Sequence, residues 1–171
     1  MGEIVRGEVS RDQQAEILLR FLDTVHGIDA LHGKRVEEVF SDEEHRRAFL
    51  DGMTQEDFMA LLNGTNGILR RKPKTEWVMD GGDVMLKGFI ESDVPPREED
   101  KRPLFEQTYE AIKQMNQDGR ALEDMALLVG VSINAIHAFA DANGRTSRLM
   151  FTLLAGRVSG TGQSALERVA W

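Results

Sequence analysis

A long apolar stretch, residues 122–139, runs directly into a sequence rich in polar residues. Large apolar side chains fall on every side of the helix that this stretch would form, namely Met125, Leu127, Leu128, Val129, Val131, Ile133 and Ile136. A helix without a polar face belongs in the centre of a helical bundle. The sequence therefore predicts a central helix whose C-terminal end delivers the polar sequence HAFADANGRTSR, residues 137–148, to one site.

Further helices are predicted on both sides of this one. Ser10, Ser41 and Thr54 suit helix N-termini, the first two because Gln or Glu follows three residues later. Pro103 suits a first helical position, and the charged run before it is either solvated surface or a helix start. That helix has an apolar side formed by Leu104, Thr108, Ile112 and Met115. Helices are expected over roughly residues 10–27, 41–52, 54–64, 103–119, 122–139 and 148–155.

The pattern changes between the third and fourth of these helices. Two short apolar runs, Trp77–Met79 and Val84–Leu86, flank a glycine-rich sequence, and Pro95-Pro96 follows them. Such a pattern predicts a β-hairpin, here over residues 75–96, with Trp77 anchoring it to the core. The expected architecture is mostly helical: a helical bundle with one hairpin on its surface.

Composition limits the classes of function. The chain has 171 residues, which suits one domain, and a formal net charge of −8. A strongly acidic domain is a poor general binder of nucleic acid or of anionic membranes. No apolar run reaches the ~20 residues of a membrane helix, and the absence of cysteine excludes thiolate chemistry. We expect a cytoplasmic protein that uses neither nucleic acid nor membrane as a partner; a secreted effector stays open.

The polar sequence has the residue types of a phosphate site. The N–H groups at the start of a helix bind anions, and Gly144 lets a ligand approach the backbone closely. Arg145 and Arg148 lie three positions apart, so both guanidinium groups can reach the same phosphate. Asp141 offers a hard oxygen for Mg²⁺, and His137 is a candidate general base. These parts together would bind a magnesium nucleotide and deprotonate a group that attacks it.

Each of these residues also has a purely structural interpretation. A histidine at the end of an apolar helix is most often a core residue, and Asp141 suits a turn. Asn143-Gly144 is an ordinary turn dipeptide, and the arginines would then be surface charges. The concentration of all of them in one short turn favours the functional interpretation.

The same stretch resembles the signature of the Fic family, His-Pro-Phe-x-Asp/Glu-Gly-Asn-Gly-Arg-x-x-Arg. The matching positions are His137, Phe139, Asp141, Asn143, Gly144, Arg145 and Arg148. Ala138 replaces the proline, and Ala142 replaces the first glycine. Asp-Ala-Asn is similar to the Doc branch, which however carries lysine where this chain has Gly144. Upstream, the sequence from Lys87 to Pro96 resembles the β-hairpin flap of Fic domains.

The resemblance implies a Fic fold, one Fic domain over residues 1–171, with a flap at 75–96 and a motif core at 122–157. It implies transfer of AMP from ATP to a Ser, Thr or Tyr hydroxyl of a target protein, with His137 as general base and Asp141 holding Mg²⁺. The residues implied in phosphate binding are Ala142, Asn143, Gly144, Arg145 and Arg148. The residues implied in docking the target segment as an added strand are Lys87, Gly88, Phe89 and Ile90.

Two alternatives stay open. If position 142 requires a positive φ, alanine would distort the phosphate cradle and change which phosphorus faces His137, so Doc-like transfer of the γ-phosphate is one alternative. A Fic-fold module that binds a partner without chemistry is the other. The chain lacks a Glu followed by Gly or Asn, the end of an inhibitory helix common in the family. We therefore expect inhibition by an antitoxin-like protein in trans, inhibition by sequence outside these residues, or no inhibition.

Overall fold

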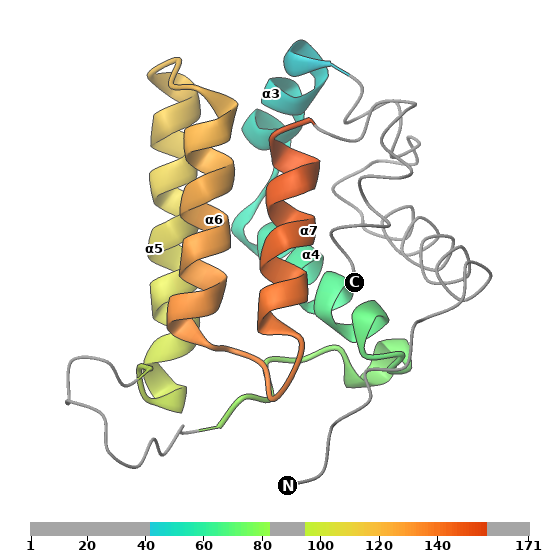
Figure 1. Cartoon of the computed structure of the whole chain (residues 1–171). Coiled ribbons are helices and arrows are strands. Elements are labelled where there is room, and N and C mark those ends of the chain that lie inside the picture. The colour runs from blue at the N-terminus through green and yellow to red at the C-terminus, as the bar shows by residue number, and fades with distance from the viewer. Residues whose placement is uncertain (1–41, 83–94, 157–171) are drawn as a thin grey trace, which may run out of the picture.

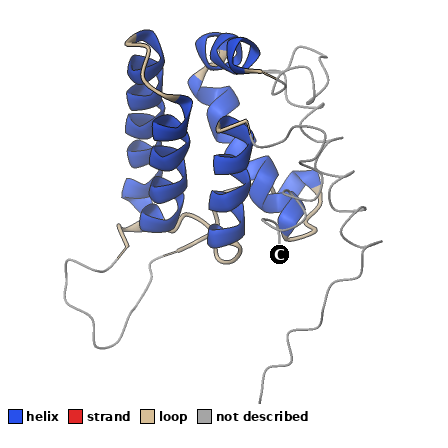
Figure 2. Ribbon diagram, turned by 45° about the horizontal axis from the view of Figure 1, so that its top comes forward, coloured by secondary structure: helices blue, strands red, loops and turns tan. Residues whose placement is uncertain are grey.

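The computed structural model describes residues 42–82 and 95–156, which form five α-helices and one turn of 3-10 helix (Figure 1). The α-helices are α3 (Glu43–Gly52), α4 (Gln55–Leu69), α5 (Glu98–Gln117), α6 (Leu122–Ile136) and α7 (Asn143–Leu154), and the 3-10 turn η2 is Lys74–Glu76. The mostly helical architecture is confirmed (Figure 2). Among these residues no helix is both long and apolar enough to cross a membrane.

The hairpin is not seen in the part of its range that the structure describes. Residues 75–82 contain the end of η2 followed by irregular chain, and Trp77–Met79 do not form the expected strand. Trp77 does pack against the core, as expected: its indole lies on α4, where a Cβ at Gly67 would lie 2.0 Å from the ring, and its Nε1 donates to the Lys72 carbonyl at 3.0 Å. Residues 83–94, which include the flap residues, and the helix expected over residues 10–27 lie outside the described residues.

The central helix is α6, which lies between α5 and α7 (Figure 1). Gly130 allows α7 to come close: a Cβ there would lie 3.2 Å from Ser147 Oγ, and that hydroxyl donates to the Gly130 carbonyl at 2.8 Å. The expectation of burial on every side is wrong, because Leu127 and Val131 are 57% and 55% exposed. The helix also ends at Ile136 rather than at Phe139.

Helix α5 begins earlier than predicted, at Glu98, so the charged run is a helix start, and Pro103 lies inside the helix rather than at its first position. The acidic first turn of the helix explains the earlier start, since carboxylates are favoured near the positive end of a helix. The buried side of α5 also differs from the prediction: Leu104 and Met115 are only partly buried. The buried residues of α5 are Lys101, Phe105, Thr108, Tyr109, Ile112 and Asn116.

The two N-terminal described helices follow their capping signals in part. Thr54 caps α4, and its side chain and that of Asp57 bond each other's backbone N–H groups, at 3.1 and 2.9 Å. The predicted end at Gly64 is wrong, because this residue is buried in a helix that continues to Leu69. Asp42, rather than Ser41, caps α3, accepting a hydrogen bond from the His45 amide at 2.9 Å.

Candidate active site

The polar motif forms the connection between α6 and α7. Its residues 137–142 make the loop, and residues 143–148 make the first turns of α7, which therefore begins earlier than the predicted Arg148. The loop lies at the end of the bundle where α5 begins and where the chain that follows α4 passes (Figure 1). The structure thus brings together the candidate residues His137, Asp141, Ala142, Asn143, Gly144, Arg145 and Arg148.

His137 caps the C-terminus of α6 in a left-handed conformation, with φ 52° and ψ 51°. Its N–H still donates to the Ile133 carbonyl at 3.1 Å, so the helix ends regularly before the chain turns away. The residue is half-buried. A left-handed conformation costs a non-glycine residue about 1–2 kcal/mol, so the surrounding contacts must hold it.

Ala142 also adopts a left-handed conformation, with φ 64° and ψ 16°, at the N-cap of α7. Position 142 therefore requires the positive φ that glycine of the Fic signature would provide. The alanine does not disturb the start of the helix, because its carbonyl accepts from both the amide and the hydroxyl of Thr146, at 2.9 and 2.8 Å. The departure from the signature costs free energy but leaves α7 regularly formed.

Asn143 is buried, and its side chain is engaged inside the loop. Its Oδ1 accepts from the Phe139 amide at 3.1 Å, and its Nδ2 donates to the Phe139 carbonyl at 2.6 Å. The side chain therefore closes the loop around Phe139. What Asn143 offers to a ligand is its backbone N–H.

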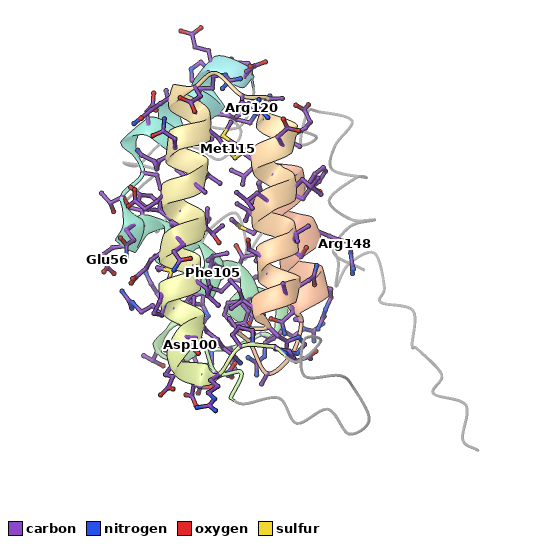
Figure 3. All side chains as sticks on the ribbon, turned by 90° about the vertical axis from the view of Figure 1, so that its left-hand side faces the viewer. Glu56, Asp100, Phe105, Met115, Arg120 and Arg148 are labelled. Atoms are coloured by element: carbon purple, nitrogen blue, oxygen red, sulfur yellow. The ribbon has the colours of Figure 1, made fainter. Side chains whose placement is uncertain are left out.

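The start of α7 has the properties of an anion site. The N–H groups of Asn143, Gly144 and Arg145 belong to the first turn, which has no intrahelical acceptors, and they accumulate the positive end of the helix dipole. A Cβ at Gly144 would lie 3.4 Å from Arg148 Nη1, so that guanidinium lies beside the first turn. Arg148 is exposed and projects from α7 on the side away from α5 (Figure 3).

Asp141 and Arg145 face each other across this first turn. Arg145 Nη2 lies 3.5 Å from Asp141 Oδ2, with side chains 30% and 74% exposed, and Asp141 Oδ1 accepts from the Ala142 amide at 2.5 Å. No group of three or more His, Cys, Asp or Glu side chains suited to a metal occurs in the described residues. Asp141 alone fits Mg²⁺ as a single carboxylate ligand, because this ion is commonly held by one or two carboxylates together with phosphate oxygens and water.

The loop is held from one side by α4. The buried Asn66 side chain donates to the Asp141 carbonyl at 2.9 Å and to the Thr146 hydroxyl at 3.1 Å. One amide group thus fixes both the residue before Ala142 and the first turn of α7. This contact leaves the carboxylate of Asp141 outside and exposed.

The irregular chain after η2 holds the loop from another side. Asp80 Oδ1 accepts from the Ala140 amide at 3.1 Å, and the same carboxylate binds Arg70 at 2.6 Å and Lys72 at 2.6 Å. Partial burial alone would raise the pKa of Asp80, but the hydrogen bonds from Arg70, Lys72 and Ala140 outweigh it and hold that pKa far below its usual range. Asp80 is therefore charged at neutral pH and fixes the exposed tip of the loop.

Gly81 continues this contact along the backbone. Its N–H donates to the Ala138 carbonyl at 2.9 Å. A Cβ at this position would lie 2.7 Å from backbone atoms of Ala138 and Phe139, a distance that requires the chain to move. Only glycine allows residues 80–82 to lie this close to the loop.

Sequence reasoning missed three residues that hold the site, namely Asn66, Asp80 and Lys101, whose ammonium donates to the His137 carbonyl at 3.0 Å. Two of them carried a signal: Asn66 follows Leu62 by four positions and Lys101 precedes Phe105 by four, so each is a polar residue on a buried helical side. Asp80 carried none, because its role depends on chain far away in sequence.

Comparison with known families agrees with this geometry. A model of the Fic/DOC family matches residues 24–155. No curated protein and no solved structure matches the chain. The family match covers most of the chain and includes the whole loop with its flanking helices, and the chain accordingly belongs to the Fic/DOC family.

Proposed function

We propose that this protein transfers AMP from ATP to a Ser, Thr or Tyr hydroxyl of a target protein. The observation that carries the proposal is that one short loop joins His137, at the end of α6, to the start of α7, which offers backbone N–H groups and two arginines. Family membership supports nucleotide transfer or a related reaction in general. The specific donor phosphorus and acceptor are the proposal.

In this reaction His137 takes the proton from the target hydroxyl. The oxygen attacks the α-phosphorus as the bond to the β-phosphate oxygen breaks, and pyrophosphate leaves with the electron pair. His137 adopts its left-handed backbone at the point where the chain leaves α6 and enters the loop. The imidazole acts from its neutral form, which the reaction converts to the cation.

The first turn of α7 holds the phosphates. Backbone N–H groups of Asn143 and Gly144 donate to phosphate oxygens, and the Ala142 N–H joins them once it exchanges its bond to Asp141 Oδ1 for one to phosphate. Arg145 and Arg148 add charge-assisted bonds. The N–H donors of the helix itself are fixed before the reaction, so they stabilise the charge that develops on the transferring group without reorganising. Bound Mg²⁺, held by Asp141, would neutralise phosphate charge and orient the leaving group.

We further propose that the target segment docks on Lys87, Gly88, Phe89 and Ile90, as an added strand bound through its main chain. Because main-chain hydrogen bonds depend little on the side chains of the docked segment, this mode of binding does not identify the target protein. An antitoxin-like protein acting in trans is the proposed inhibitor.

Transfer of the γ-phosphate is the second candidate, and Ala142 is the observation that favours it. The Asp-Ala-Asn sequence is the one similar to the Doc branch, and Ala142 carries the required positive φ. Two features favour AMP transfer instead: the start of α7 is regular despite the alanine, and Gly144 stands where that branch has lysine.

Separate measurements of ATP binding and of AMP transfer test the roles proposed for Arg148 in binding phosphate and for His137 in catalysis. Calorimetric titration with Mg-ATP should show binding to the wild type and to His137→Ala, and at least ~10-fold weaker binding to Arg148→Ala. Mass-spectrometric mapping of lysate proteins should show AMP adducts with the wild type and none with His137→Ala. His45→Ala, a change of an exposed histidine on α3, is the matched control and should behave as wild type. AMP transfer that survives His137→Ala would contradict the mechanism, and absence of ATP binding would favour the binding module.

A further inference from the structure

Lys101 is a buried lysine on the inner side of α5, with 2% of its surface exposed. Lysine is rarely buried to this degree, because its charge loses the solvation of water unless hydrogen bonds replace it. Here carbonyl groups replace it. The ammonium donates to the carbonyls of Gly81, of Gly82 at 2.8 Å and of His137 at 3.0 Å.

These three carbonyls come from two different parts of the chain. Gly81 and Gly82 belong to the irregular chain beside the motif loop, and His137 is the first residue of the motif. An ammonium has three N–H donors, so one lysine can satisfy all three carbonyls and join both segments to α5. The charge strengthens each of these bonds over a neutral one.

The contact falls on the residue whose backbone needs support. His137 is left-handed, a conformation that persists only where its surroundings impose it. The bond from Lys101 to its carbonyl fixes the peptide plane that follows the imidazole-bearing residue. The bonds from Gly81 to Ala138 and from Asp80 to Ala140 continue the same fixation along the loop.

We propose that Lys101 is a positioning residue that sets the backbone of His137, and therefore the direction of its imidazole relative to the phosphate end of α7. The part that concerns catalysis rests on the proposed function, in which His137 is the general base. The structural part does not. Loss of the ammonium would release the loop from α5 and from residues 81–82 together.

The test compares Lys101→Met with Lys113→Met. Lys113 is the matched control because it lies on the same helix and also donates to carbonyls, those of Leu50 at 2.9 Å and of Met53 at 3.4 Å, away from the motif. Amide hydrogen exchange should accelerate at least ~10-fold at Gly81 and Ala140 in Lys101→Met, because loss of the ammonium frees both segments. The core amide of Ile133 should keep its wild-type rate, and Lys113→Met should leave all three unchanged.

Steady-state kinetics separate a positioning role from a merely structural one, because only the positioning role should lower kcat without changing KM for ATP. With any substrate protein found, Lys101→Met should lower kcat on the order of 100-fold while KM for ATP changes less than about threefold. The reason is that the base is misplaced, whereas Asn66 still holds Asp141 and the first turn of α7 at the phosphate end of the loop. Wild-type exchange at Gly81 and Ala140, or equal losses of kcat in both lysine variants, would overturn the proposal.

Two outcomes remain to be separated. If the wild type transfers no nucleotide, the proposed function fails, and the exchange experiment still decides whether Lys101 fixes the loop. If Lys101→Met does not fold, Lys101→Arg decides: its planar fork cannot meet three carbonyls grouped around an ammonium, so loop exchange should rise and kcat should fall. Wild-type exchange and kcat in Lys101→Arg would then refute the positioning role.

Discussion

The side chain of Asn143 pairs with the backbone of Phe139 through two hydrogen bonds, one accepted from its amide at 3.1 Å and one donated to its carbonyl at 2.6 Å. This pairing closes the loop that carries the histidine. It explains why the motif has an asparagine at this position even when no phosphate is bound.

Replacing Asn143 should therefore destabilise the protein even without a ligand. Asn143→Asp keeps the acceptor but sets a negative charge against the Phe139 carbonyl, so we expect a loss of about 2–4 kcal/mol in the free energy of unfolding. Asn143→Ala, which removes both bonds, should lose about 1–3 kcal/mol. Urea denaturation measures both, and unchanged midpoints in the absence of nucleotide would show that the pairing does not hold the loop.

The left-handed backbone of Ala142 predicts a substitution that stabilises. Ala142→Gly removes the steric penalty of φ 64°, and we expect the free energy of unfolding to rise by about 0.5–1 kcal/mol after allowance for the lost methyl group. Ala126→Gly, in the middle of α6, is the matched control and should destabilise by at least about 1 kcal/mol. Thermal unfolding of both variants checks the opposite signs; a loss of stability in Ala142→Gly would show that the left-handed conformation is not strained.

Adjacent glycines at 81 and 82 should respond differently to alanine. A Cβ at Gly81 meets backbone atoms of the motif loop at 2.7 Å, whereas a Cβ at Gly82 has Glu98 Oε2 at 4.0 Å as its nearest neighbour. We expect Gly81→Ala to cost about 1–3 kcal/mol of stability, because backbone must move. Gly82→Ala should be close to neutral. Equal effects in denaturant melts would mean that the chain at 81 does not lie against the loop.

The Asp80 carboxylate predicts a loss of stability in acid. Its pKa in the folded protein lies below the unfolded value of 3.8, so its stabilising contribution is complete above that value and is lost as the pH falls below it. Asp80→Asn should be less stable than wild type at pH 7, by about 1–3 kcal/mol. The difference in the free energy of unfolding between wild type and Asp80→Asn should narrow from about pH 5 downward. Denaturation curves across this range test the sign; a gap that widens in acid would be inconsistent with a depressed pKa.

Much of the fold was predictable from local signals. The apolar stretch of residues 122–139 predicted α6, and the capping residue Thr54 predicted the start of α4, because both signals act within a few residues. The prediction that α4 ends at Gly64 is wrong, because the last turns of that helix are buried by residues outside it, including Trp77, whose ring lies against Gly67. The early start of α5 depended on acidic residues that precede Pro103.

The candidate site likewise has a part that was predictable from local sequence and a part that was not. The motif placed its own polar residues at one turn, and the structure brings those residues together. The contacts that hold this turn come from Asn66, Asp80 and Lys101, which are distant in sequence and meet it only in three dimensions. The sequence analysis could only say what would follow if position 142 required a positive φ, because a sequence does not reveal a backbone angle. The structure shows that Ala142 has a positive φ.

If His137 is the general base for transfer of AMP, protein-bound label should come from the α-phosphate of ATP and should depend on this residue. Wild type and His137→Ala are incubated with Mg²⁺, a cell lysate, and ATP labelled at either the α- or the γ-phosphate. We predict protein-bound label from the α-phosphate alone, absent in His137→Ala and present in the His45→Ala control. Protein-bound label from the γ-phosphate alone, lost in His137→Ala, would contradict it and place the protein with phosphate-transferring relatives.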